Sequence, residues 1–190
     1  MIRTKADYRM YISEDAKANG RTSEKRKLFG DESWKFQIAL RKMEYLSNQG
    51  GVKRIICLPL RLIAKFRLHK VAIKLGFSIP INVFGPGLSI PHYGTIVVAK
   101  GASIGKNCRI HEGVTIGATN GSSAAAQIGD NVFIASGAKI VGAVSIADNV
   151  AIGANAVVVK SIDEPGTTWG GIPARKISDN GSSSNLNVHL

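Results

Sequence analysis

Two histidines, His92 and His111, lie within the stretch of this chain that has a regular residue pattern, and His92 lies where that pattern is interrupted. An imidazole is the side chain best suited to exchange a proton near neutral pH. His92 lies in the segment PHYGTIVVA and is a candidate for such proton transfer, because an imidazole can take a proton from a group within hydrogen-bond reach. The alternative is a solvated or packing histidine.

His111 lies in the segment RIHEGVT, directly after an isoleucine of the regular pattern and directly before Glu112. It should therefore project outward at a corner. Two interpretations stay open: His111 lines an acceptor site or assists His92, or it has a plain surface role. Glu112 could polarise an imidazole, although neighbouring residues rarely point together. We place both residues as candidates for the acceptor site and assign no role to His69 and His189.

A six-residue repeat predicts the elements that position these side chains. The aliphatic positions of the repeat are Val98, Ile104, Ile110, Ile116, Ile128, Ile134, Ile140, Ile146, Ile152 and Val158, and small residues follow four positions later. Neither a helix nor a flat two-sided strand has this period. It is the period of a parallel β-helix built from hexapeptide turns. The glycines and asparagines between these positions tolerate the positive φ that sharp corners require.

The repeat is interrupted at two places. Between Ile90 and Val98 the spacing slips by two residues, and the inserted segment contains His92. At position 122 a serine replaces the aliphatic residue, within the polar segment TNGSSAAAQ at 119–127, and the repeat resumes in phase at Ile128. Loops that leave a rigid scaffold often carry function, so we expect the site near these interruptions.

The chain divides into three predicted parts: a helical N-terminal subdomain at 1–76, the β-helix at 77–177, and a polar, mobile tail at 178–190. A first helix should run through KADYRMYISEDAK and break at Asn19-Gly20. Asp31 can cap a second helix that begins near Glu32 and ends near residue 48. A third should run from about Leu60 to Leu75, opened by Pro59.

The formal net charge of +12 suggests anionic partners, and much of it lies before residue 77. The basic helix at 60–75 either lies on an anionic membrane surface or packs against the coil or another subunit, which is the favoured interpretation. Nucleic acid is the weakest candidate because no aromatic-plus-basic motif is present.

Other features of the sequence predict a cytoplasmic protein. No run of eighteen apolar residues occurs, and the residues at 1–5 lack the apolar block of a signal peptide. Cys108 falls on a small inward position of the coil, and Cys57 lies in an apolar run. Both cysteines are interpreted as buried filler rather than as catalytic thiols.

The segments VTIG, IGDNVFIASGAKIVG, IGANAVVVK and GGIPARKI resemble the hexapeptide-repeat acyltransferases. PHYGTIVVA resembles the serine acetyltransferases and the related O-acetyltransferases of surface polysaccharides. The resemblance covers about 79–177. It implies a left-handed parallel β-helix, acetyl-CoA as the acyl donor and a catalytic histidine, here His92. A prism of this kind buries its flat faces against its own copies, so we expect a homotrimer, or a hexamer of two trimers.

The resemblance also implies a binding site for the cofactor. The pantetheine arm should pass the main chain of three residues, Ala118, Ser136 and Ala154. Lys160 and Arg175 are placed like the family's residues near the CoA phosphates, although either could be a solvated charge. Trp169 packs near the adenine or, as we favour, covers the open end of the coil. No metal is expected.

The acceptor prediction follows from the departures from the serine acetyltransferases. Those enzymes carry an aspartate before the catalytic histidine, where this chain has Pro91, and an Arg-His pair in the loop, where it has Ala124 and Ala125. The two charges of serine need polar partners when they lose water. A sugar hydroxyl, of a polysaccharide precursor, is therefore the predicted acceptor, and free serine is the alternative.

The sequence disfavours two other classes of protein, a zinc enzyme and a non-catalytic module. A zinc enzyme of the γ-carbonic-anhydrase type needs three converging histidines, and the coil contains only His92 and His111, without close metal-ligand spacing. A non-catalytic trimeric scaffold or membrane-surface module would need neither the inserted histidine nor the GIPAR and VVVK segments.

Overall fold

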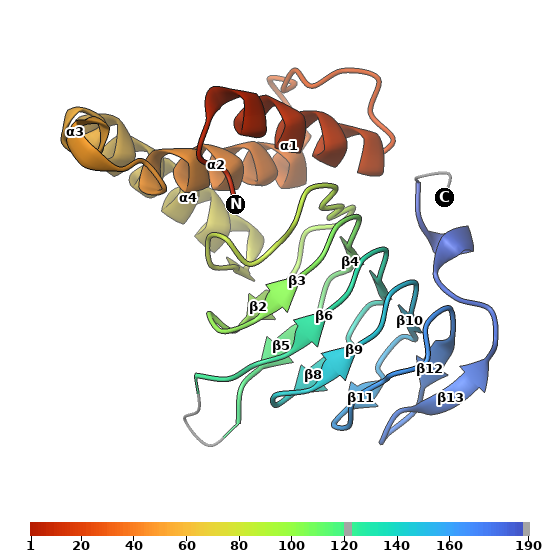
Figure 1. Cartoon of the computed structure of the whole chain (residues 1–190). Coiled ribbons are helices and arrows are strands. Elements are labelled where there is room, and N and C mark those ends of the chain that lie inside the picture. Colours follow the sequence, from red (N-terminus) through yellow and green to blue (C-terminus); the bar gives the residue numbers. More distant parts are fainter. Residues whose placement is uncertain (120–122, 188–190) are drawn as a thin grey trace.

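The six-residue repeat winds into a coil with three faces, each of them a sheet whose strands are parallel except for the last strand of the second sheet (Figure 1). The computed structural model describes residues 1–119 and 123–187, so positions 120–122 of the predicted loop and the last three residues lie outside the described residues. The first sheet contains β1 (Phe77–Ser78), β2 (Ile96–Val98), β5 (Thr115–Gly117), β8 (Lys139–Val141) and β11 (Val157–Val158). The second contains β4 (Arg109–Ile110), β7 (Phe133–Ile134), β10 (Ala151–Ile152), β12 (Thr168–Gly170) and β13 (Arg175–Ser178). The third contains β3 (Ser103–Ile104), β6 (Gln127–Ile128) and β9 (Ser145–Ile146).

The repeat positions stack on one another as the sequence predicts. Ile110 pairs with Ile134, and Ile134 pairs with Ile152, and all three are fully buried. Burying such a side chain contributes about 1.5–3 kcal/mol relative to leaving it exposed, so the stacked aliphatic residues are the main source of the coil's stability. Cys108 is buried among them, which confirms it as a packing residue, and burial raises the pKa of its thiol to about 12.

One corner of the coil is closed by a ladder of asparagines. The Asn107 side-chain amide donates to Asn131 over 2.9 Å, and that of Asn131 donates to Asn149 over 3.0 Å. All three residues have a positive φ, between 54° and 61°. Asparagine is among the few residues that accept this conformation, so the ladder confirms the predicted role of these positions at the corners.

Four helices form the N-terminal part: α1 (Lys5–Ala18), α2 (Glu32–Ser47), α3 (Gly51–Ile56) and α4 (Leu58–Leu75). Three of them were expected, and Pro59 lies in the first turn of α4 as predicted. The short helix α3 was not expected. Asp31 does not cap α2 through its side chain, which was the prediction; its carboxylate instead receives two hydrogen bonds from Arg21, at 3.0 and 2.9 Å.

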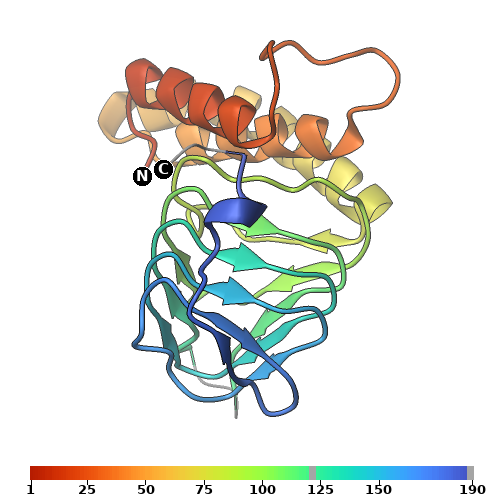
Figure 2. The same ribbon diagram turned by 90° about the vertical axis from the view of Figure 1, so that its right-hand side faces the viewer.

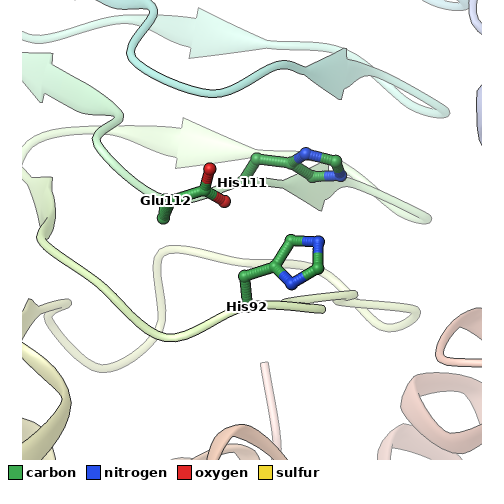
Figure 3. Close-up of side chains that lie close together, drawn as sticks. All are labelled: His92, His111 and Glu112. Carbon is green, nitrogen blue, oxygen red and sulfur yellow. The ribbon is translucent and has the colours of Figure 1, made fainter.

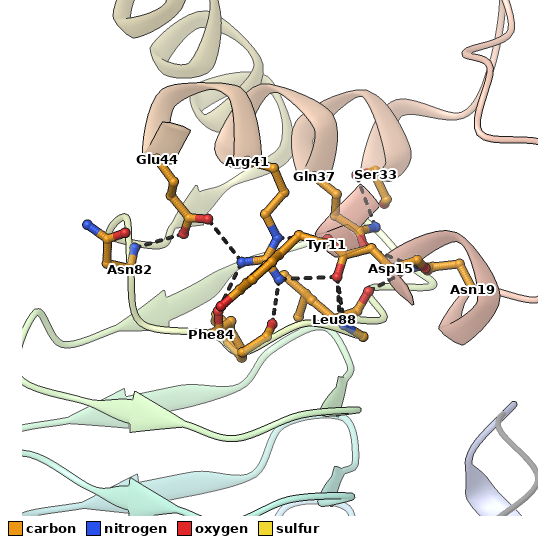
Figure 4. A network of polar contacts seen from close by, with 12 residues as sticks. Tyr11, Asp15, Asn19, Ser33, Gln37, Arg41, Glu44, Asn82, Phe84 and Leu88 are labelled. Atoms are coloured by element: carbon orange, nitrogen blue, oxygen red, sulfur yellow. Dashed lines mark hydrogen bonds and ion pairs between the residues drawn. The ribbon is translucent and has the colours of Figure 1, made fainter. Parts of the chain in front are cut away.

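A buried ion cluster fastens the helices to the first turn of the coil (Figure 4). Arg41 of α2 is fully buried and donates to Asp15 of α1, to Glu44, and to the carbonyl oxygens of Phe84 and Gly85. Burial alone would lower the pKa of Arg41, but attraction to Asp15 and Glu44 outweighs it and raises that pKa. The cluster therefore fixes the chain just before the segment that contains His92.

The lower end of the coil differs from the regular pattern. β13 runs antiparallel to β12, so the chain reverses at the lower end. From there the tail runs back along the coil toward the helices (Figure 2). Ser182 is fully buried, and the Asn187 amide donates to the carbonyl of Ala18 over 3.1 Å. The tail therefore contacts the coil and helix α1 as far as Asn187, and its mobility stays a prediction. Among the described residues, no helix is long and apolar enough to cross a membrane.

Candidate active site

One edge of the coil collects several of the predicted site residues. At this edge the chain crosses from the sheet of β4, β7 and β10 to the sheet of β2, β5, β8 and β11. His92 lies in the first crossing, after Ser89, which bridges to Arg109 of β4. Glu112, Ser136 and Ala154 lie in the three crossings below. Because parallel strands stack in register, residues about twenty positions apart become neighbours along this edge.

His92, His111 and Glu112 lie together on two neighbouring turns (Figure 3). One ring nitrogen from each histidine and one carboxylate oxygen of Glu112 lie within 4.8 Å of one another. The two imidazole rings meet edge to face, with centroids 5.5 Å apart. His92 is exposed and His111 and Glu112 are half-buried, so the histidine predicted to be the base is open to a substrate.

Glycine at position 94 allows the close approach of these two turns. Gly94 has a φ of 138°, and a Cβ there would come within 2.9 Å of the Cβ of Glu112. That distance is shorter than carbon atoms tolerate, so any other residue would push the His92 turn away from Glu112. The PHYG sequence therefore places glycine at the position where the side chain of Glu112 packs against the backbone.

One oxygen of the Glu112 carboxylate has no hydrogen-bond partner among the described residues. This atom, Oε2, is buried. A hydrogen bond from the Ser136 side chain lowers the pKa of Glu112 the most, and the neighbouring His92 and His111 lower that pKa further. The group is therefore a carboxylate at neutral pH, aimed at a pair of imidazoles. Sequence reasoning named Glu112 but did not expect it and His111 to point together.

His111 is less suited than His92 to act as a general base. The Arg109 guanidinium donates to Nε2 of His111 over 3.3 Å, and Phe133 packs edge-on against the ring at 5.1 Å between centroids. Burial and the Arg109 charge lower the pKa of His111. Sequence reasoning missed Arg109, which a two-residue spacing on the same strand could have flagged.

The sequence shows no close spacing of metal ligands, but in the structure the side chains of His92, His111 and Glu112 do converge. They nevertheless do not fit a three-ligand metal centre. The lone pair of His111 Nε2 already accepts a hydrogen bond from Arg109. A guanidinium at that position repels a divalent cation, so a fit would require Arg109 to move away.

A pocket of about 430 Å³ opens beside His92, between the coil and the helices. Pro91, Tyr93 and Arg109 line one side of it, and Asp31 and Glu32 of the helical part line the other. Both signs of charge therefore face a cavity that adjoins the candidate base. Asp31 is paired with Arg21, and Glu32 lies 3.3 Å from Lys35 and 3.5 Å from Lys74.

The chain is similar to known acyltransferases in sequence and in fold. The sequence pattern "Bacterial transferase hexapeptide (six repeats)" matches residues 125–160. The serine acetyltransferase of Mycobacterium tuberculosis is 34% identical over 120 residues, which cover 62% of this chain and 52% of that protein. The chain thus spans about half the length of the curated relatives it matches.

Two solved structures agree over most of the chain. A serine acetyltransferase in complex with CoA superimposes with a TM-score of 0.68 at 21% identity, covering 91% of this chain and 71% of the other. The soybean serine acetyltransferase apoenzyme gives a TM-score of 0.68 at 26% identity, covering 91% and 70%.

The chain is similar in sequence and in fold to serine acetyltransferases. The predicted fold, an all-β left-handed parallel β-helix with an α-helical N-terminal subdomain, is confirmed by these comparisons.

The predicted cofactor residues fall into two groups. Ser136 and Ala154 share the edge of His92, while Ala118 follows β5 and lies at a different edge of the same prism. Ala118 can therefore share a groove with His92 only if the two come from neighbouring copies. The carbonyl of Ser136 already accepts a hydrogen bond from the Asn155 N–H over 2.9 Å, so this oxygen is used inside the coil.

The residues expected near the CoA phosphates meet at the lower end of the coil. Lys160 and Arg175 line one pocket of about 300 Å³ together with Trp169 and Pro173. Both basic residues are exposed. Trp169 is packed against the coil's core, which agrees with the favoured role as a cover, and its Nε1 donates to Thr167 over 2.9 Å. Their contact with CoA stays a prediction.

The loop argument for a changed acceptor is weakened by burial. Ala125, expected at a position that faces the acceptor, is only 2% exposed and belongs to the core of the coil. A side chain there cannot touch an acceptor, whatever its charge. Ala125 therefore does not support a lost charged partner for serine. The departures at Ala124, which is exposed, and at Pro91, which lines the pocket, remain.

Proposed function

We propose that this chain transfers an acetyl group from acetyl-CoA to an acceptor hydroxyl, with His92 as the general base. The observation that carries the proposal is the exposed His92 beside the open carboxylate of Glu112, at the edge shared with Ser136 and Ala154. The likeness to serine acetyltransferases supports the same reaction.

The chemistry follows from the geometry of the edge. His92 takes the hydroxyl proton as the oxygen forms a bond to the thioester carbon, and the carbon–sulfur bond then breaks. The imidazolium gives its proton to the departing thiolate of CoA, so the base is regenerated. Backbone N–H groups of a neighbouring coil would stabilise the oxyanion between these steps.

Glu112 acts in this proposal as a positioning residue. One of its carboxylate oxygens lies within 4.8 Å of a ring nitrogen of His92, and the carboxylate stabilises the ring most when the ring is positively charged. A fixed negative charge beside a developing imidazolium lowers the energy of the charged state. This role replaces the acceptor-site role that the sequence suggested for Glu112.

Serine is the acceptor that we propose, in place of the sugar. The curated relatives that the chain matches are serine acetyltransferases, and the burial of Ala125 removes one of the positions on which the argument for a neutral acceptor rested. Arg109 lines the pocket and can face a carboxylate. The acidic residues Asp31 and Glu32 are already paired with Arg21, Lys35 and Lys74, so an ammonium group would have to share them. A desolvated zwitterion needs partners of both signs.

We further propose that the active enzyme is a homotrimer. Ala118 and His92 lie at different edges of one prism, so a groove that holds the whole pantetheine arm requires two copies. A hexamer of two trimers and a cytoplasmic location stay predictions.

The test is the release of CoA from acetyl-CoA with L-serine, compared with a panel of free and nucleotide-linked sugars. The proposal expects turnover with L-serine and little with any sugar. Turnover restricted to a sugar would keep the reaction and overturn the acceptor. No turnover with any hydroxyl, by protein that binds acetyl-CoA, would overturn the reaction itself.

A further inference from the structure

Helices α3 and α4 form an arm with a strong charge bias, which the acyl-transfer proposal does not use. Residues 51–75 contain seven basic side chains and no aspartate or glutamate. The basic side chains are Lys53, Arg54, Arg61, Lys65, Arg67, Lys70 and Lys74. The arm projects to one side, where the coil does not cover it (Figure 1).

The same arm exposes large apolar side chains. Val52, Ile55 and Ile56 of α3 are 71%, 74% and 69% exposed. On α4, Phe66 and Ile73 are 66% and 68% exposed, and only Ala64 and Leu75 of that helix are buried. Leaving this much apolar surface in water is unfavourable, and contiguous patches of this kind usually mark a contact surface.

Apolar and basic residues on α4 are arranged as a stripe with charged borders. At 100° per residue, Leu58, Leu62, Phe66 and Ile73 share one face of the helix. On the same geometry Lys70 and Lys74 fall on one side of that stripe, and Arg61 and Lys65 fall on the other. Long basic side chains in such positions can keep their charges in the polar layer while the stripe enters an apolar one. A cleft of about 590 Å³ between α4 and β1 opens beside the stripe.

We propose that this arm lies on a membrane surface that carries anionic lipids, with the stripe in the acyl boundary and the basic borders at the phosphate groups. Each basic residue near such a surface adds attraction, and the apolar stripe adds buried area. The proposal does not depend on acetyl transfer.

Charge selects lipid over a second copy of this chain. A symmetric contact between two arms would bring seven basic residues against seven, with no acidic residue on either. An asymmetric contact would place the arm on the coil of another copy, and residues 77–177 carry seven basic against five acidic side chains, so the coil has no net negative charge to offer. A surface of anionic headgroups supplies the opposite charge directly.

The test is co-sedimentation of the full chain with vesicles of phosphatidylcholine alone and of phosphatidylcholine mixed with phosphatidylglycerol. The wild type should sediment with the mixed vesicles and be released by salt. The double variant L62E/F66E should lose binding. The double variant K70Q/K74Q should bind roughly 30-fold more weakly, because two surface charges are lost.

The matched control is K25Q/K27Q, which removes two exposed lysines from the loop before α2. It should bind nearly as well as the wild type. Unfolding midpoints of all variants should match the wild type, since every changed side chain is exposed. Equal binding to both kinds of vesicle, no binding to either, or an L62E/F66E variant that only lowers the oligomeric mass would overturn the proposal.

Discussion

Two clusters of charged side chains differ sharply in how far they are satisfied. At the junction of helices and coil, Arg41 is fully buried, and all three of its guanidinium nitrogens donate to Asp15, Glu44 or a backbone carbonyl. At the edge of the coil, His92 is exposed, and Glu112 Oε2 has no partner among the described residues. Buried polar atoms are nearly always paired, so the unpaired atom needs an explanation. We infer that the Arg41 cluster holds the fold and the His92 cluster awaits a substrate.

The difference is also one of location. The Arg41 cluster joins three segments and fixes the backbone at Phe84 and Gly85, a few residues before His92. The His92 cluster lies on two turns of the coil, which are already rigid. One cluster can therefore be damaged without the other, and variants can separate their roles.

The largest effect on stability should come from Arg41→Met. The change leaves Asp15 and Glu44 buried without their cation and should cost about 3–5 kcal/mol of unfolding free energy. Urea denaturation measures it. Arg9→Met, on the exposed face of α1, is the matched control and should change stability by less than about 0.5 kcal/mol. A cost for Arg41→Met as small as the control's would show that the cluster is not what holds the junction.

Glu112→Gln should lower kcat about tenfold, equivalent to about 1.4 kcal/mol, with little change in the KM for acetyl-CoA. Removing a negative charge beside the imidazole disfavours its protonated form. The acidic limb of the pH profile of kcat/KM should therefore move to lower pH. Glu24→Gln, at an exposed site, is the control. An unchanged pH profile in Glu112→Gln would reduce Glu112 to a packing residue.

Lys160→Met and Arg175→Met should each raise the KM for acetyl-CoA about fivefold and leave kcat nearly unchanged, since both residues are exposed and screened by water. Steady-state kinetics measures both values. Repeating the assay with acetyl-dephospho-CoA is the control, because the penalty should shrink when the 3′-phosphate is absent. Equal penalties with both donors would place these residues away from that phosphate.

The smallest effect concerns His111 and pH. Burial and Arg109 lower the pKa of His111 below its ordinary value of 6.5, so the folded state resists its protonation. The stability associated with neutral His111 is therefore present above that value and lost as the pH falls below it. Wild type should lose a fraction of a kcal/mol more than His111→Gln between neutral pH and about one unit below the ordinary value. Parallel losses in urea denaturation would contradict this assignment.

Much of the coil could be predicted because its information is periodic. Each inward position, such as Ile110 or Ile134, repeats the same requirement, so one missing position at 122 did not obscure the pattern. The helices α1, α2 and α4 carry local signals of their own. The short helix α3 has none that is distinctive, and it was missed.

The junction and the site depended on contacts that the sequence does not display. Arg41 reaches Asp15 across 26 positions and Phe84 across 43, and nothing local distinguishes it from a surface arginine. His92 could be picked out because it interrupts the repeat. The convergence of Glu112 on His92 depends on the register between two turns and on the space left by Gly94, which only the structure reveals.

The most direct test of the account is the rate of CoA release from acetyl-CoA and L-serine by His92→Asn, measured beside its urea unfolding curve. The account predicts a loss of about 10²–10⁴-fold in kcat with an unfolding free energy close to that of the wild type. A variant that folds normally and still turns over at the wild-type rate would contradict it, because the open cluster would then not be the catalytic one.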